Sequence, residues 1–207
     1  MAKLTEAFAP RDGVELLKAE TIGASYGRLL RYTVRYRRFD GSWLGPVTRD
    51  CFDSGHAVIV LPYDSRTDEI MLVKQFRIGP AAAGSDPWLY EIPAGRLDKA
   101  NATAEEIARS EAYEEAGLVI SDLERIGAFF ASPGIFSEHL DAFCGRASGM
   151  KSGVFGLPEE HEDIQAEVMP ADRAIAMAQS GEIKSGPALV ALFWLAMNRK
   201  RLAMKWV

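Results

Sequence analysis

The sequence predicts an α/β (α+β) fold, an α/β/α sandwich in which helices cover both faces of a mixed sheet, preceded by a small N-terminal β-hairpin or antiparallel module. Two observations support this prediction. β-prone and helical segments follow one another along the larger part of the chain, and a separate β-prone stretch stands ahead of them. A length of 207 residues with 48% hydrophobic content suits one domain with a small appendage. We expect the N-terminal module at residues 1–53 and the main domain at residues 54–207.

The first elements are strands. Residues 28–38 read Arg-Leu-Leu-Arg-Tyr-Thr-Val-Arg-Tyr-Arg-Arg, which is β-prone and partly alternating. The turn signal Asp40-Gly41 follows, and a second extended stretch ends at residues 49–52, so this part predicts a hairpin. Residues 56–63 and 69–78 are rich in Val, Ile and Leu and flank a short polar segment. They predict two core strands joined by a turn.

The later elements alternate between strand and helix. A loop at residues 79–87 leads through an extended segment at 88–92 into a helix at about 103–117. Residues 145–162 are rich in Gly, Ser and charge without periodicity, which predicts a mobile loop. The remaining expected elements are strands at 123–131 and 142–144 and helices at 171–180 and 187–199.

Charge and composition exclude several classes of protein. The net charge of −5 and the pI near 5.3 argue against nucleic acid or an anionic membrane as the main partner. The basic runs at 28–38 and 198–201 leave nucleic-acid binding as an alternative, although an outward strand face and a helix C-terminus account for both. The first 13 residues hold no apolar core of the secretory type, and the apolar run at 188–197 is too short to span a bilayer. We therefore expect a cytoplasmic protein with no membrane partner.

Three glutamates stand out in the predicted helix at 103–117. Thr103 and Glu106 form a capping-box pattern, so Glu111, Glu114 and Glu115 fall on one side of the helix. The positions four before and four after them hold no lysine or arginine. Like charges at this spacing cost about 0.2–0.5 kcal/mol when exposed, whereas clustered carboxylates suit Mg²⁺ or Mn²⁺. A cation site and a solvated acidic face are both compatible with the spacing.

Residues 95–118 resemble the Nudix box, whose usual form is Gly, five residues, Glu, seven residues, Arg-Glu-apolar-x-Glu-Glu-x-Gly-apolar. The segment begins Gly-Arg-Leu-Asp and ends Arg-Ser-Glu-Ala-Tyr-Glu-Glu-Ala-Gly-Leu. Further segments, in order along nearly the entire chain, resemble ADP-ribose pyrophosphatases of the Nudix hydrolase superfamily. They are residues 55–62, 75–78, 87–95, 131–134 and 160–164. The resemblance implies a Nudix-type fold and a metal-dependent pyrophosphohydrolase.

Two departures from the box concern its metal site. Ser110 stands where the box has arginine, Arg109 lies one place earlier, and one extra residue follows Gly95. In the family that arginine helps to orient a box glutamate. The first glutamate of the box is also missing, with Asn101 nearest to its place. Neither change removes an expected metal ligand.

The resemblance implies a set of metal ligands for Mg²⁺, with Mn²⁺ as a substitute. Glu111, Glu115 and the carbonyl of Ala94 would be the principal ligands, and Glu162 would complete the set. Glu114 would be an additional ligand or would support the others. These positions match the family's motif one by one.

The resemblance also assigns the step that activates water. Glu160 would act as the general base, as the matching loop does in ADP-ribose pyrophosphatases. Gly95 would let the backbone turn so that the preceding carbonyl points inward. An acidic solvated loop at residues 159–163 is the alternative for the same segment.

Substrate contacts and partners follow from the same resemblance. The substrate would be ADP-ribose or a related nucleoside diphosphate sugar, cleaved to AMP and ribose 5-phosphate, and the N-terminal module would pack against a second subunit in a homodimer. Each substrate-binding position could instead be a surface ion pair or a packed aromatic residue. The five positions are Tyr26, Arg49, Arg77, Glu91 and Glu138.

Three other functions compete with this one. The segment Gly-Ala-Ser-Tyr-Gly at residues 23–27 matches the nucleophile elbow of serine hydrolases, but a β-prone stretch follows it where that motif needs a helix. Within the same superfamily, a GDP-sugar pyrophosphatase of the GDP-mannose type shares the chemistry. A non-catalytic sensor of ADP-ribose is the third alternative, since Ser110 replaces the box arginine.

Overall fold

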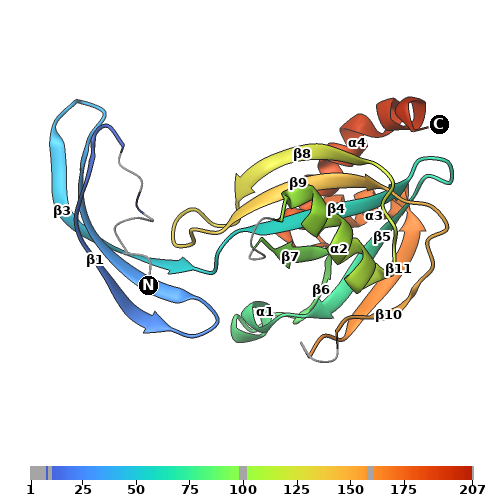
Figure 1. Ribbon diagram of the computed structural model, residues 1–207, viewed down its shortest axis with the longest axis horizontal. Coiled ribbons are helices and arrows are strands. Elements are labelled where there is room, and N and C mark those ends of the chain that lie inside the picture. The colour runs from blue at the N-terminus through green and yellow to red at the C-terminus, as the bar shows by residue number, and fades with distance from the viewer. Residues whose placement is uncertain (1–7, 9–10, 98–101, 158–160, 207) are drawn as a thin grey trace. The chain divides into compact units, whose positions relative to one another are not determined.

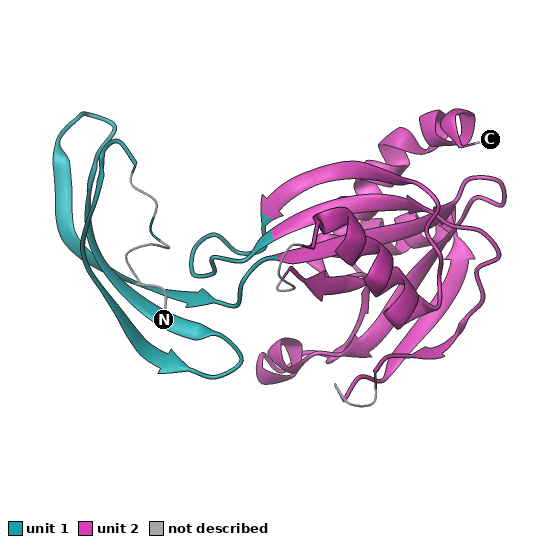
Figure 2. Cartoon of the chain, in the orientation of Figure 1, with its two compact units in different colours: residues 1–56, 130–139 teal, residues 57–129, 140–207 magenta. Residues whose placement is uncertain are grey.

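The computed structural model describes residue 8 and residues 11–97, 102–157 and 161–206 (Figure 1). The chain divides into two compact units (Figure 2). The first comprises Met1–His56 with Phe130–His139, and the second comprises Ala57–Phe129 with Leu140–Val207. Phe130–His139 belongs to the first unit although it lies far along the sequence. It contacts the rest of that unit at Phe52, whose N–H donates to the Ile135 carbonyl at 2.7 Å.

The first unit is an antiparallel sheet in the order β1-β2-β3. These strands are β1 (Val14–Ala24), β2 (Arg28–Arg37) and β3 (Trp43–Asp53). The expected antiparallel module is confirmed, and β1 adds a strand that the sequence did not predict. The segment Val-Glu-Leu-Leu-Lys-Ala-Glu is rich in helix formers, so its extended state comes from pairing with β2 rather than from local preference.

The basic run of β2 is matched by acids on the neighbouring strands. Arg31 donates to the Asp50 carboxylate of β3 at 2.7 and 2.8 Å, and Arg35 donates to Glu15 of β1 at 2.6 Å. Arg35 also lies over the ring of Trp43, 5.0 Å from its centroid. Acids on the neighbouring strands therefore balance the positive charges of Arg31 and Arg35 within the same sheet.

The serine of the elbow-like segment lies in a turn. Ser25 follows β1, and its N–H donates to the Gly27 carbonyl at 2.9 Å before β2 begins. A nucleophile elbow needs a strand followed by a helix. The strand that follows Ser25 therefore removes the structural context for a serine hydrolase.

The second unit is built on a mixed sheet in the order β10-β11-β5-β4-β9-β8, with β6 paired to β5 and β7 paired to β4. β4 and β9 run parallel, whereas β11 runs antiparallel to β10 and β5, β4 to β5 and β7, and β5 to β6. The strands are β4 (Ala57–Asp64), β5 (Glu69–Phe76), β6 (Trp88–Glu91), β7 (Ala94–Arg96), β8 (Leu123–Phe130), β9 (His139–Arg146), β10 (Gly153–Phe155) and β11 (Ile164–Pro170).

Helices cover both faces of this sheet, as expected. Figure 1 shows α2 (Ala104–Ala116) on one face and α3 (Ala171–Ser180) with α4 (Gly186–Lys205) on the other. β4 contributes to the apolar cores on both faces of the sheet, because its successive side chains point to opposite faces. Val58 and Val60 pack with the α2 side, while Ile59 and Leu61 pack with the α3 and α4 side. A strand buried on both faces reads as a continuous apolar run, which explains why the sequence signal for β4 was clear.

Three expectations are corrected in this unit. The segment at 145–162, expected to be a loop, contains a strand. β10 lies there and pairs with β11, and Phe155 packs on the α2 core. β11 itself was not predicted, although Ile164 and Ala166 are buried and alternate with exposed Gln165. The expected strand at 69–78 ends at Phe76, and a short helix α1 (Ile78–Ala82) opens the expected loop.

Across the described ranges, no helix is long and apolar enough to cross a membrane.

Candidate active site

Helix α2 is fixed in position at both ends and along one side. The Thr103 hydroxyl accepts the Glu106 N–H at 3.2 Å, and the Glu106 carboxylate accepts the Thr103 N–H at 2.8 Å, which confirms the capping box. Gly117 ends the helix in the left-handed region at φ 64°. Ile107 and Ala112 on α2 are buried in the core against β4, so the rotation of the helix about its axis is set. The direction of each glutamate follows from that rotation.

Glu115 is a buried carboxylate. Its side chain lies on α2 with 3% of the residue exposed, and its Oε2 accepts the Ala94 N–H at 3.1 Å. Burial raises the pKa of Glu115 well above its usual value; the hydrogen bond from Ala94 acts in the opposite sense. The negative charges of Glu111 and Glu162 raise this pKa further, whereas Arg77 lowers it. The negative charges of Glu111 and Glu162 therefore act on the buried Glu115 carboxyl group.

Glu111 lies across the backbone of β7. A Cβ added at Gly95 would fall 1.8 Å from Glu111 Oε1 and 2.0 Å from its carboxyl carbon. Gly95 sits within a strand and is not among the glycines with positive φ, so the expectation that it supplies a turn is wrong. Its missing side chain instead leaves the space that the Glu111 carboxylate occupies.

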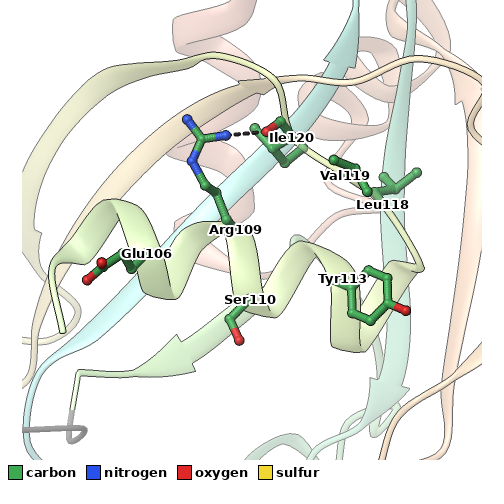
Figure 3. Close-up of a pocket in the computed structure, with 7 residues that line it drawn as sticks. All are labelled: Glu106, Arg109, Ser110, Tyr113, Leu118, Val119 and Ile120. Atoms are coloured by element: carbon green, nitrogen blue, oxygen red, sulfur yellow. Dashed lines mark hydrogen bonds between the residues drawn. The ribbon is translucent and has the colours of Figure 1, made fainter.

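Glu114 is held by a serine, and Arg109 points elsewhere. The Ser110 hydroxyl donates to Glu114 Oε1 at 2.6 Å. The Arg109 guanidinium donates to the Ile120 carbonyl, and Figure 3 shows its side chain leaving the helix away from Ser110. Arg109 and Ser110 border a surface pocket of about 480 Å³, which is also lined by Glu106, Tyr113, Leu118, Val119 and Ile120. Arg109 thus serves the α2 to β8 connection and does not replace the box arginine.

Glu162 lies two residues before β11 and bonds to Leu157. Its Oε2 accepts the Leu157 N–H at 3.1 Å, and its own N–H donates to the Leu157 carbonyl at 3.3 Å. Its charge reaches Glu115, since it raises the pKa of that carboxyl. The expected base Glu160 lies outside the described residues, as does Asn101.

Arg77 and Glu91, both expected at the substrate, bind each other. Arg77 donates through Nε at 3.0 Å and through Nη2 at 2.7 Å to Glu91 Oε2. Buried Gln75 donates to the same oxygen at 3.3 Å. The hairpin of β5 and β6 brings these side chains together, and the charge of Arg77 lowers the pKa of Glu115.

The other three expected substrate residues belong to the first unit. Tyr26 stands in the turn between β1 and β2 with 71% of the residue exposed. Arg49 is exposed on β3 and donates to the carbonyl of Thr48 at 2.9 Å. Glu138 accepts the Ser54 hydroxyl at 3.2 Å. Two of these residues, Tyr26 and Arg49, are thus exposed on their own unit.

The donor set fits a divalent cation, although the side chains do not converge on one point. Within the part of the chain that the structure describes, no group of three or more His, Cys, Asp or Glu side chains is already arranged to hold a metal ion. Glu111 nevertheless occupies a space that any larger residue at position 95 would fill, and Glu115 is a desolvated acid beside it. Carboxylate oxygens are the preferred ligands of Mg²⁺ and Mn²⁺.

Sequence reasoning did not assign a role to two residues of this site. Gln75 holds Glu91, and Ser110 holds Glu114. The i, i+4 spacing of Ser110 and Glu114 on a predicted helix was a readable signal. Gln75 gave no such signal, because its contact depends on the pairing of β5 with β6.

The chain belongs to the NUDIX domain family, which it matches over residues 53–189. Among named relatives, it is 34% identical to the ADP-ribose pyrophosphatase of Escherichia coli strain K12 over 197 residues, covering 95% of this chain and 94% of that protein. The ADP-ribose pyrophosphatase of Haemophilus influenzae is also 34% identical, with coverage of 96% and 93%. The GDP-mannose pyrophosphatase of Salmonella arizonae is 31% identical, with coverage of 90% and 97%.

A solved structure supports the fold. The crystal structure of an ADP compounds hydrolase matches with a TM-score of 0.70 at 16% identity, covering 96% of this chain and 98% of that one. The α/β sandwich with its mixed sheet is therefore a Nudix fold. Family membership and the named relatives together make this protein a Nudix-type hydrolase.

Proposed function

We propose that this protein hydrolyses ADP-ribose to AMP and ribose 5-phosphate with the help of Mg²⁺. The observation that supports this most is the placement of buried Glu115 at the Ala94 N–H and of Glu111 over Gly95, in a chain that is 34% identical to an ADP-ribose pyrophosphatase over nearly its whole length. Hydrolysis consumes one water and breaks one P–O bond of the diphosphate. Such a reaction needs charge neutralisation and a positioned water.

The metal-binding residues of this proposal are those on β7 and α2. Glu111, Glu115 and the Ala94 carbonyl would hold the ion, joined by Glu162, with Glu114 as a further ligand or support. The bound ion would neutralise charge on the diphosphate oxygens and polarise water. The hydrogen bond from the Ala94 N–H keeps one oxygen of Glu115 in place, which leaves the other oxygen for an ion.

The other expected residues would bind the substrate and activate water. Arg77 offers a planar guanidinium to phosphate oxygens, and its bonds to Glu91 orient it before substrate arrives. Tyr26, Arg49 and Glu138 would contact the adenosine and ribose parts. Glu160 would accept the proton of the attacking water.

A panel assay tests the substrate. ADP-ribose and GDP-mannose are supplied separately with Mg²⁺ or with EDTA, and nucleotide release is measured by chromatography. We expect AMP release from ADP-ribose, with loss of activity in EDTA, because the acids of α2 would repel the diphosphate unless a divalent cation neutralises their charge. Faster GMP release from GDP-mannose would favour the GDP-mannose pyrophosphatase alternative, which rests on the relative from Salmonella arizonae. Tight ADP-ribose binding without turnover would favour the sensor.

Replacement of the expected base tests the step that activates water. The Glu160→Gln variant should have a strongly reduced kcat and a nearly unchanged KM for ADP-ribose, since glutamine keeps the shape but accepts no proton at this site. Steady-state kinetics at saturating Mg²⁺ measure both constants. An increase in KM with normal kcat would assign Glu160 to substrate binding instead.

The proposal includes a homodimer and a cytoplasmic location. The first unit presents apolar side chains to solvent on β1, including Leu17 at 50% and Ile22 at 41% exposure, which supports contact with a second copy. Both statements stay predictions from the sequence and its resemblance.

A further inference from the structure

We propose that Ser110 is a positioning residue, whose hydroxyl holds one oxygen of the Glu114 carboxylate and leaves the second oxygen for a divalent cation. This inference rests on the proposed function, because it assumes that the acids of α2 bind a divalent cation. It concerns a residue that stands where the family has an arginine.

The contact itself is short and lies within one turn of helix. Ser110 Oγ and Glu114 Oε1 are 2.6 Å apart, and both residues are half-buried. This distance is in the range of hydroxyl donors to ionised carboxylates, which are stronger than neutral pairs. A serine inside a helix often bonds back to the carbonyl four residues earlier. Here the hydroxyl donates forward to the carboxylate.

The chemistry of the donor matters as much as its position. A hydroxyl is neutral, so it fixes the orientation of Glu114 and leaves its negative charge available to a cation. An arginine at the same place would also fix the carboxylate, but it would neutralise much of that charge. Glu115 is held in the same manner by a neutral donor, the Ala94 N–H. Of the three α2 glutamates expected at the metal site, Glu114 and Glu115 are therefore oriented by neutral donors.

Arg109, the arginine that precedes Ser110 in the sequence, does not compete for this role. Arg109 donates to the Ile120 carbonyl beyond the C-terminal end of the helix (Figure 3). A shift of Arg109 toward Glu114 would break that contact and would have to pass around the helix. Ser110 is thus the residue that holds Glu114 in this structure.

Metal binding without substrate gives the first test. Mn²⁺ is titrated into the metal-free protein and free Mn²⁺ is followed by electron paramagnetic resonance, for the parent, Ser110→Ala, Ser110→Thr and the control Ser121→Ala. Ser121 is exposed and its hydroxyl bonds to Asp122. We expect about tenfold weaker Mn²⁺ binding in Ser110→Ala, near-parent binding in Ser110→Thr, and no change in the control. Parent affinity in Ser110→Ala would overturn the proposal.

A double-mutant cycle shows whether Ser110 acts through Glu114. In a Glu114→Ala background, Ser110→Ala should cause no further loss of Mn²⁺ affinity, because the group that it positions is gone. The same tenfold loss in that background would assign Ser110 a general structural role and would contradict the proposal. Thermal melts in EDTA should give Ser110→Ala the parent midpoint, whereas a lowered midpoint with parent Mn²⁺ affinity would also contradict it.

Kinetics then separate this inference from the proposed function. With ADP-ribose as substrate, Ser110→Ala should raise the Mg²⁺ concentration for half-maximal rate by the same factor and leave the KM for ADP-ribose at saturating Mg²⁺ unchanged. An increase in KM alone would overturn the role of Ser110 in metal binding. If the parent releases no AMP, the proposed function fails, while the Mn²⁺ titrations still decide the role of Ser110.

Discussion

Replacement of Glu115 by glutamine is expected to reduce turnover of ADP-ribose by several orders of magnitude and to leave the fold intact. Glutamine keeps the shape of the side chain and an oxygen for the Ala94 N–H, so the contact at 3.1 Å can persist. It removes the charge that would hold the ion at the reacting diphosphate. Steady-state kinetics with Mg²⁺ and circular dichroism measure the two effects. Near-normal activity would remove Glu115 from the metal site.

The same variant makes a second prediction in the absence of metal. Because burial raises the pKa of Glu115, its contribution to stability is fully present below its unfolded value near 4.5 and is lost as pH rises through its folded value. Glutamine carries no charge and does not titrate. In EDTA, Glu115→Gln should therefore melt at a higher temperature than the parent at pH 8, and the difference should shrink at pH 4.

A matched control is available on the same helix. Glu105 lies in the first turn of α2 and is exposed, so Glu105→Gln makes the same chemical change away from the site. We expect it to retain both turnover and the pH dependence of the parent. A loss of activity in Glu105→Gln equal to that in Glu115→Gln would show that the effect comes from the charge of the helix as a whole.

The Gly95→Ala variant is expected to lose about 10²-fold in kcat, because a misplacement of about 1 Å at a reacting centre has effects of this size. The new methyl group would fall 1.8 Å from Glu111 Oε1 and 2.5 Å from its Cγ, so the whole end of that side chain must move. The backbone at position 95 is not in the left-handed region, and the strand itself tolerates alanine. We therefore expect a large kinetic effect with a modest change in melting temperature.

Gly127→Ala is the control for this experiment. Gly127 lies in β8, and a Cβ added there would meet nothing within 4 Å. This variant should keep the activity of the parent. Normal activity in Gly95→Ala would mean that Glu111 reaches the ion from another rotamer, and that the space over Gly95 is not needed.

The parts of the fold that depend on local signals were predictable from the sequence. The capping box at Thr103 and the glycine at 117 gave the bounds of α2, and both are confirmed. The continuous apolar run of β4 was equally clear. β1, β10 and β11 were missed because their extended state depends on pairing with another strand, such as Gln165 of β11 with Lys74 of β5. Residues 14–20 of β1 are rich in helix formers.

The site was predictable as a set of residues and not as a set of contacts. The spacing of Glu111 and Glu115 identified one side of a helix, but the burial of Glu115 depends on how α2 packs against β7. The mutual pairing of Arg77 and Glu91 depends on the register of β5 and β6, in which Phe76 lies opposite Trp88. The reason for glycine at position 95 is the space over a strand, which no sequence pattern reveals.

Helix α2 has two tasks that are physically joined. Ile107 and Ala112 on one side of it pack into the apolar core, and the neighbouring side carries Glu111, Glu114 and Glu115. An ion that binds these acids in the native protein and not in the unfolded chain stabilises the native protein, by about 2.7 kcal/mol when its free concentration is a hundred times its dissociation constant. If the acids of α2 hold such an ion, the supply of divalent ions would govern how long the chain survives heat and proteolysis, as well as how fast it turns over.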